Sequence, residues 1–178
     1  MTEASDRAAG RKSAAEVFVL DTSAIYNATD YPADSILYST PLVVRELRRV
    51  YRTERAELFV QSRLRITEPG RASSEWIRKK AVESGDITRL SPTDLEVLSL
   101  AKELRAVLVT EDYSMQNIAG AAGIEFRSLY LPPIKDYVEW ELKCMSCGTV
   151  SATKDAKECM ICGGKLITRR RKSRPIKS

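Results

Sequence analysis

The sequence predicts an α/β domain with a parallel sheet, followed by a small module that four cysteines hold together. Short apolar runs alternate with helical segments of about ten to fifteen residues, the pattern of βαβ units. All four cysteines lie between Cys144 and Cys162, and Pro132-Pro133 separates them from the alternating part. Because a Pro-Pro pair continues neither a helix nor a central strand, we expect a domain boundary there.

Local patterns predict each element in turn. Val17–Leu20 is a continuous apolar run, typical of a buried parallel strand. Thr40 and Pro41 predict a helix start, with the threonine as N-cap and the proline in the first turn. Gly85 and Gly123 predict helix ends, since glycine readily adopts the left-handed conformation found there. The expected helices are 41–51, 54–62, 73–84, 93–105 and 113–122, and the expected strands are 17–20, 64–67, 106–110 and 124–126.

The chain of 178 residues can hold one ordinary domain and a small module. No apolar run is long enough to span a bilayer, and the first residues lack the apolar segment of a secretory signal. We therefore expect a soluble, cytoplasmic protein with no membrane partner. The expected parts are a flexible N-terminus over 1–15, the α/β domain over 16–131, a linker over 132–138, the cysteine module over 139–168 and a mobile basic tail over 169–178.

Positive charge is concentrated near the C-terminal end. The net charge is +5, but residues 138–178 hold ten Lys/Arg and four Asp/Glu, so the preceding part has a net charge of −1. Seven of these bases follow Cys162 with no acid among them. Such a segment attracts polyanions, of which the nucleic-acid backbone is the commonest inside cells. A solvated end that merely aids solubility is an equal alternative.

The four cysteines form two CxxC pairs, Cys144 with Cys147 and Cys159 with Cys162, with eleven residues between the pairs. Each CxxC turn directs two thiolates at one point, and the glycine after each second cysteine permits a left-handed turn. Four thiolates saturate a tetrahedral Zn²⁺ ion, so we expect a structural zinc site. A redox-active pair is the alternative, and the symmetry of the two pairs argues against it.

Two acids directly follow predicted strands. Asp21 comes after the first strand, and Asp112 follows the 106–110 strand by two residues. Residues just beyond the carboxyl ends of parallel strands share one crevice, so the two carboxylates can converge. Ordinary helix N-caps are the alternative for both acids.

Two further acids lie on inward helix faces. Glu46 falls within the apolar sector of the 41–51 helix, where an unpaired carboxylate is strongly unfavourable. Asp94 faces inward at the start of the 93–105 helix. Clustered carboxylates are typical of Mg²⁺ or Mn²⁺ sites, because the cation relieves their repulsion. The alternatives are an arginine partner for Glu46 and a capping box with Ser91 for Asp94.

These segments together resemble a PIN-domain ribonuclease. With the four-cysteine ribbon that follows them, these segments are similar to the NIN-one-binding protein family over about residues 16–170. The chain is compact, like the archaeal members of that family. This family comprises endonucleases that trim the 3′ end of small-subunit ribosomal RNA. The resemblance rests on Leu20-Asp21-Thr22-Ser23-Ala24, Glu46, Leu90-Ser91-Pro92-Thr93-Asp94, Val109-Thr110-Glu111-Asp112 and Asp112-Tyr113-Ser114-Met115-Gln116-Asn117.

The resemblance implies a three-layer α/β/α PIN domain with a parallel sheet, followed by a zinc ribbon. It implies that Asp21, Glu46, Asp94 and Asp112 hold one or two Mg²⁺ or Mn²⁺ ions and that Thr110 supports the site. It also implies precursor ribosomal RNA in the pre-small subunit as substrate, and other ribosome-assembly proteins as candidate partners. Glu111 departs from the Asp usual beside the last acid, a change expected to be harmless if Glu111 points away from the crevice.

The absence of histidine excludes Ser-His-Asp triads, Cys-His pairs and imidazole bases. We therefore expect metal-assisted hydrolysis that leaves a 3′-hydroxyl and a 5′-phosphate. A non-catalytic RNA-binding assembly factor stays open, as does a PIN-type toxin ribonuclease, although toxins of that type generally lack a zinc ribbon. The arginines of the 41–51 helix either contact RNA or form ion pairs with Glu54 and Glu57. The predicted RNA contacts are Arg45, Arg48, Arg49, Lys143, Arg169, Arg170, Arg171 and Lys172.

Overall fold

The computed structural model describes residues 15–27 and 31–176, so almost all of the expected N-terminal segment lies outside the described residues. Five parallel strands form one sheet in the order β3-β2-β1-β4-β5. The sheet consists of β1 (Val17–Leu20), β2 (Ile36–Ser39), β3 (Leu64–Ile66), β4 (Val107–Val109) and β5 (Phe126–Arg127).

Helices connect successive strands and cover both faces of the sheet. From β1 the chain passes to β2 and β3 on one side of the sheet, and it then returns past β1 to β4 and β5 on the other side. Because parallel connections are right-handed, the helices of these two halves lie on opposite faces of the sheet. The expected three-layer α/β/α arrangement is therefore confirmed. The helices are α1 (Thr22–Tyr26), α2 (Pro41–Val50), α3 (Glu54–Arg63), α4 (Arg71–Ser84), α5 (Pro92–Leu104) and α6 (Tyr113–Ala122).

The centre of the sheet is the most apolar part of the molecule. Strands β1 and β4 pair in parallel, with Leu20 opposite Val109, and almost all of their side chains are buried. Two neighbouring strands therefore end side by side, and the Asp21 amide still donates to the Val109 carbonyl at 3.3 Å. This register brings the residues that follow β1 and β4 to one place at the sheet edge.

Most expected elements are present within a residue or two of their predicted bounds, but α1 and β2 were missed. Strand β2 has four residues, and its apolar run, Ile36 to Tyr38, is only three residues long. Helix α1 has five residues, too few to show a helical period. Gly85 and Gly123 end α4 and α6 in the left-handed conformation, as predicted.

The C-terminal part forms an antiparallel two-stranded arm, which corrects two expectations. Strand β6 (Asp136–Cys144) begins inside the expected linker, and β7 (Leu166–Pro175) runs through the expected mobile tail. The basic residues stay ordered because β7 pairs with an acid-bearing strand, placing Arg169 opposite Glu141 and Lys172 opposite Glu139. Lys177 lies outside the described residues.

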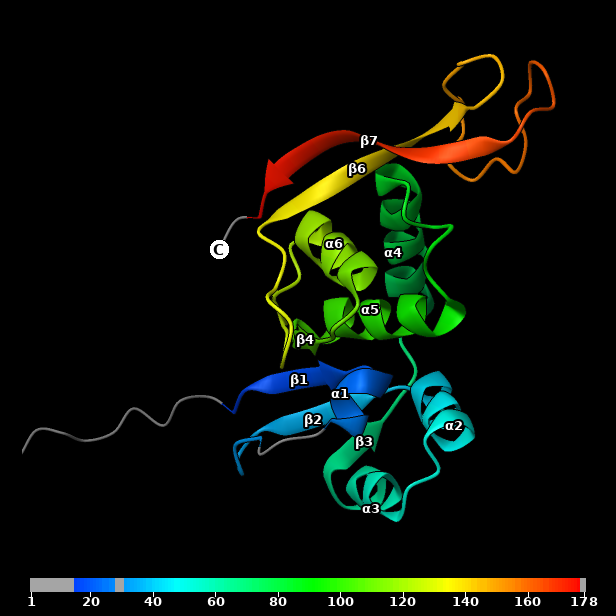
Figure 1. The fold of residues 1–178 in the computed structure, drawn as a ribbon. Helices are drawn as coiled ribbons and strands as arrows, with labels where there is room; N and C mark the ends of the chain where they lie inside the picture. Colours follow the sequence, from blue (N-terminus) through cyan, green and yellow to red (C-terminus); the bar gives the residue numbers. More distant parts are fainter. Residues whose placement is uncertain (1–14, 28–30, 177–178) are drawn as a thin grey trace, which may run out of the picture.

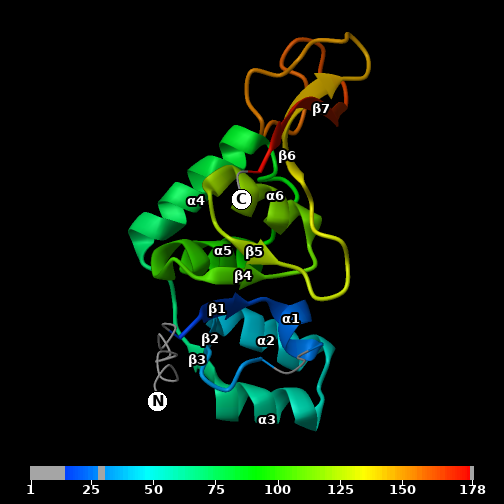
Figure 2. The same ribbon diagram turned by 90° about the vertical axis from the view of Figure 1, so that its left-hand side faces the viewer.

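Figure 1 shows α4, α5 and α6 stacked between the sheet and this arm, with α3 at the opposite end of the molecule. The view in Figure 2, turned by 90°, gives the same order and shows the arm projecting beyond α4 and α6. Within the described residues, no helix has the length and apolar character needed to cross a membrane.

Candidate active site

Asp21 stands at the carboxyl end of β1 and is the N-cap of α1. Its Oδ1 accepts hydrogen bonds of 2.8 Å from the Ala24 amide and the Ser23 hydroxyl. Its Oδ2 accepts a hydrogen bond from the hydroxyl of Thr110, which follows β4. The N-cap alternative is thus correct for Asp21, and the same carboxylate also lies in the crevice expected at the sheet edge.

Thr110 connects Asp21 with Asp112. Its side chain is fully buried, and its Oγ1 accepts a 3.1 Å hydrogen bond from the Asp112 amide while donating to Asp21. Asp112 is the N-cap of α6, and its Oδ1 accepts from the amides of Ser114 at 2.6 Å and Met115 at 3.0 Å. One small hydroxyl therefore fixes the relative positions of two acids that the sequence separates widely.

Asp94 begins α5 in a complete capping box with Ser91. The Asp94 amide donates to the Ser91 hydroxyl at 3.1 Å, and the Ser91 amide donates to Asp94 Oδ2 at 2.7 Å. Glu46 is half-buried on α2 and makes no ion pair with any described base, so the arginine alternative does not apply to it. For Asp94, the capping box uses one oxygen of the carboxylate, so the residue can cap α5 and also face the other acids.

The negative charges of neighbouring acids raise the pKa values of Asp21 and Asp94. Burial raises the pKa of Asp21, and the charge of Asp94 adds to the rise, although hydrogen bonds from Thr110 and others lower it. Burial also raises the pKa of Asp94, and the charges of Asp112 and Glu46 add to that rise. Asp94 is thus coupled electrostatically to each of the other three carboxylates. A divalent cation would relieve this repulsion.

The carboxylates are more widely spaced than the cysteines. Among the described residues, the cysteines are the group of three or more metal-binding side chains whose ligand atoms all lie within 4.8 Å of one another. No described donor reaches Asp94 Oδ1 or Asp112 Oδ2, because the caps use the other oxygen of each acid. Mg²⁺ keeps several waters and needs only one or two direct carboxylates. The acids therefore fit a partly hydrated divalent ion.

Two residues near these acids were not predicted. Glu96 on α5 accepts a 3.2 Å hydrogen bond from the Leu42 amide, which ties the first turn of α2 to α5. The Tyr31 hydroxyl is buried without a described hydrogen-bond partner, and burial followed by the charge of Asp21 raises its pKa. No sequence pattern singled out either residue: Glu96 is two residues after Asp94, a spacing that puts the two on different faces of a helix.

Glu111 points away from the other acids. It accepts a 2.7 Å hydrogen bond from the Ser128 hydroxyl and further bonds from the amides of residues 129–131. Burial favours a higher pKa, but these hydrogen bonds together hold the pKa of Glu111 below its usual range. The Glu111 side chain binds the 128–131 segment instead of entering the crevice. This is the condition under which the Glu in place of the usual Asp was expected to be harmless.

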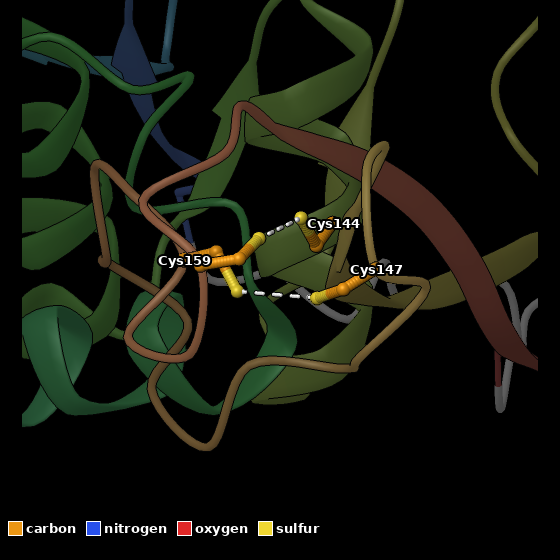
Figure 3. Close-up of side chains that lie close together, drawn as sticks. Cys144, Cys147 and Cys159 are labelled. Atoms are coloured by element: carbon orange, nitrogen blue, oxygen red, sulfur yellow. Dashed lines mark hydrogen bonds between the residues drawn. The ribbon is translucent and has the colours of Figure 1, made fainter.

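The four cysteines converge at the far end of the arm. Figure 3 shows Cys144, Cys147 and Cys159 directed toward one point. The Sγ atoms of Cys144 and Cys162 are 3.5 Å apart, and those of Cys147 and Cys159 are 3.6 Å apart. These separations exclude disulfides and approach the roughly 3.8 Å that Zn–S bonds of about 2.3 Å give in a tetrahedron. The four cysteines could therefore bind zinc.

The turns around the cysteines favour a bound cation. Gly148 and Gly163 adopt φ values of +74° and +67°, the left-handed turns predicted after each CxxC pair. The hydroxyl and backbone amide of Thr149 lower the pKa of Cys147 to about 6. The Gly164 amide lowers the pKa of Cys162, but the neighbouring thiols outweigh it and raise that pKa to about 12. Four adjacent thiolates thus require a compensating positive charge.

The predicted RNA-contacting residues occupy two separate surfaces. Arg48 forms a two-pronged ion pair with Glu57, at 2.6 and 3.0 Å, so the ion-pair alternative is correct for this arginine. Arg45 and Arg49 are exposed on α2 and make no ion pair with a described carboxylate. The other predicted contacts, Lys143, Arg169, Arg170, Arg171 and Lys172, lie on the arm, where Arg171 is 4.0 Å from Glu139.

Comparison with known proteins identifies relatives of this chain. The family model for the PIN domain of ribonuclease matches residues 18–104. Endoribonuclease Nob1 of Methanothermobacter thermautotrophicus is 36% identical, over 87% of this chain and 94% of that protein. Endoribonuclease Nob1 of Pyrococcus abyssi is 35% identical, over 87% and 96%. Ribonuclease VapC1 of Thermoplasma acidophilum is 29% identical, over 83% and 75%.

A five-stranded parallel sheet with carboxylates at its strand ends, together with the match of residues 18–104 to this family model, defines a PIN-domain nuclease. The four-cysteine arm and the alignment over nearly the full length of the first two relatives narrow the class further. The chain belongs to the Nob1 endoribonuclease family. It is an endoribonuclease, and the toxin alternative is not favoured.

Proposed function

We propose that this endoribonuclease matures small-subunit ribosomal RNA by hydrolysing the precursor at its 3′ end, in the cytoplasm and within the pre-small ribosomal subunit. Membership of the Nob1 family supports this substrate. The observation that carries the chemistry is the convergence of acids from separate elements, in which Thr110 links Asp21 to Asp112 and Asp94 is coupled to the others.

A bound Mg²⁺ or Mn²⁺ ion would supply Lewis acidity to the scissile phosphate and lower the pKa of a coordinated water. Asp94 Oδ1 and Asp112 Oδ2 are the oxygens best placed to hold it, because the helix caps use the opposite oxygens. Asp21 is held in a fixed orientation by three hydrogen bonds and contributes negative charge. Glu46 completes the set from α2. Thr110 keeps the two strand ends in register.

The cysteine centre has a structural role in this proposal. Four thiolates around Zn²⁺ leave no position for substrate, so the ion would stabilise the end of the arm. The exposed cations of β7 would then hold RNA through its phosphate backbone. Arg169, Arg170 and Lys172 suit this role best, because none of them forms an ion pair with a described carboxylate, although Glu141 and Glu139 lie opposite Arg169 and Lys172 on β6.

Cleavage of a precursor small-subunit RNA by metal-depleted protein tests the proposal. Mn²⁺ or Mg²⁺ added back should restore a single major cut near the mature 3′ end, with a 3′-hydroxyl on the upstream product. Glu46→Gln should abolish the metal-restored cut. Glu75→Gln, a matched change of an exposed helix glutamate paired with Arg71, should leave the cut intact.

The result that would overturn the proposal is equal cleavage by Glu46→Gln and by the unaltered protein. Binding of the precursor without metal-restored cleavage would also overturn it, because that outcome fits a non-catalytic assembly factor. Binding should weaken as salt rises if phosphate contacts dominate.

A further inference from the structure

Helix α6 carries two buried amide side chains in addition to the acid that caps its first turn. Asp112 caps its first turn, and two buried amide side chains, Gln116 and Asn117, follow four and five positions later. Since a helix rises about 1.5 Å per residue, Asn117 lies roughly 7.5 Å along α6 from Asp112. The proposed chemistry uses Asp112 and leaves the two amides unexplained.

Gln116 connects the nuclease site with the segment that leads into the arm. The side chain is completely buried. Its Nε2 donates to the Thr110 carbonyl at 3.1 Å, and its Oε1 accepts a 3.1 Å hydrogen bond from the Ile134 amide. One end of this amide therefore holds the residue that links the strand-end acids, and the other end holds the chain just before β6.

Asn117 pairs with β6 as a neighbouring strand would. Its Nδ2 donates to the Val138 carbonyl at 2.8 Å, and its Oδ1 accepts from the Val138 amide at 2.6 Å. The same Nδ2 donates to Asp86 Oδ2 at 2.7 Å. Both donor hydrogens of this nearly buried amide are thus used, and its contacts join α6, the α4–α5 turn and the arm.

The α4–α5 turn is fitted closely to the arm. Asp86 is completely buried there, accepts a 2.7 Å hydrogen bond from Ser84 and lies 3.9 Å from Arg89. The Arg89 guanidinium lies 3.9 Å above the ring of Trp140 on β6. A Cβ added to Gly85 would lie 2.8 Å from the Trp140 carbonyl oxygen, and φ of Gly85 is +86°. Because a buried carboxylate needs specific partners, these contacts favour one fixed arrangement of the α4–α5 turn and the arm over a flexible connection.

We propose that Asn117 and Asp86 are positioning residues, which fix the arm relative to the carboxylate site and thereby select the phosphodiester that is cut. This inference rests on the proposed function for its substrate. Strand β6 runs roughly 20 Å from Val138, where Asn117 holds it, to Cys144, at about 3.4 Å per residue. A rotation of about 10° at this contact moves the cysteine end by roughly 3.5 Å, which shifts RNA held on the arm relative to the carboxylates.

Asn117→Ala in the full-length protein tests the proposal. The chain has two tryptophans, so a Trp76→Phe background leaves Trp140 as the sole reporter of the contact. We expect the Trp140 emission to shift to longer wavelength, because the indole becomes more exposed. Cleavage of the precursor should spread over neighbouring positions, with KM raised roughly tenfold. The kcat for a short single-stranded RNA that cannot reach the arm should stay within about twofold.

Two variants separate positioning from loss of structure. Asp86→Asn keeps an oxygen facing Asn117 and should retain the unaltered cutting position. Ser99→Ala removes a buried hydroxyl that bonds only within α5, and it should change neither the emission nor the cut. Zinc content and melting temperature confirm that each variant is folded. Asn117→Ser, which retains part of the polar contact, replaces Asn117→Ala if the latter does not fold.

An unchanged cutting position and unchanged KM in a folded Asn117→Ala protein would overturn the inference. If the unaltered protein cleaves neither RNA, the proposed function fails, and the emission still decides whether Asn117 fixes the arm. In that case an emission shift supports the fixed arrangement, and an unshifted emission overturns it.

Discussion

At the residue scale, each aspartate of the site uses its two oxygens differently. Asp94 and Asp112 each cap a helix with one oxygen and leave the other without a described donor. Asp21 instead uses both oxygens, one on the α1 cap and one on Thr110. The same acid can therefore be a helix cap and a candidate metal ligand, so the two interpretations do not exclude each other. The sequence could place Asp21 and Asp112 after strands and Asp94 at a helix start, but which oxygen stays free depends on side-chain rotamers.

Replacing Asp21 with Asn separates charge from shape. Burial raises the pKa of Asp21, so its charged form opposes folding when no cation is bound. We expect Asp21→Asn to raise the melting temperature of metal-free protein, because the neutral amide avoids the cost of burying a charge. Metal-dependent cleavage should fall roughly 100-fold or more. A lower melting temperature together with normal cleavage would contradict both expectations.

Thr110→Val tests the hydroxyl that joins the two strand-end acids. The change keeps the shape but leaves Asp21 Oδ2 and the Asp112 amide without a partner in a buried position. Denaturant unfolding should show a loss of about 1–3 kcal/mol, the range for an unsatisfied buried polar group. Cleavage should fall as well, because Asp21 and Asp112 lose their common anchor. Thr110→Ser keeps the hydroxyl, so it should behave almost like the unaltered protein.

At the scale of elements, predictability followed the strength of local patterns. Strand β1 is a continuous apolar run, and α6 is bounded by Asp112 and Gly123, so both were predicted closely. Strand β7 was expected as a mobile tail because its many charges conceal a strand pattern. Its order comes from pairing with β6 across more than twenty residues of intervening chain, and no local signal reports such pairing.

The cysteine centre offers a test at this scale. A Cβ added to Gly164 would lie 2.6 Å from Ser146 Oγ and 3.0 Å from Cys144 Sγ, so it would disturb one sulfur directly. We expect Gly164→Ala to release zinc at chelator concentrations that the unaltered protein withstands, measured with a colorimetric zinc indicator. Gly123→Ala is the control: unlike Gly164, Gly123 has a positive φ of +65°, but its added Cβ meets no atom within 4 Å. Equal zinc retention by the two variants would exclude close packing at Gly164.

At the scale of the whole molecule, the acids of the site and the exposed cations of β7 lie on different parts of the protein. Asp21 and Asp112 lie just beyond the carboxyl ends of β1 and β4, whereas the exposed cations of β7 lie on the arm. RNA bound along the arm would meet the acids only where a divalent cation offsets their repulsion of phosphate. Composition alone could show the uneven charge, but the distance between the two regions depends on long-range contacts such as Asn117 with Val138.

The same acids should make the stability of the whole protein depend on pH and divalent metal together. The folded-state pKa values of Asp21 and Asp94 are raised, so the folded protein binds more protons than the unfolded chain just above the usual aspartate range. The stability of metal-free protein should therefore fall as pH rises through that window. Bound Mn²⁺ replaces those protons, so its stabilising effect should grow with pH.

Thermal melts at about pH 5 and about pH 8, with and without added Mn²⁺, measure this coupling. Mn²⁺ at 100 times its Kd should add about 2.7 kcal/mol at the higher pH, and clearly less at the lower pH, where protons compete. A double Asp21→Asn and Asp94→Asn variant should lose most of the Mn²⁺ effect at both pH values. If Mn²⁺ stabilised the unaltered protein equally at both, the ion would be bound away from these carboxylates, and the proposed site would be wrong.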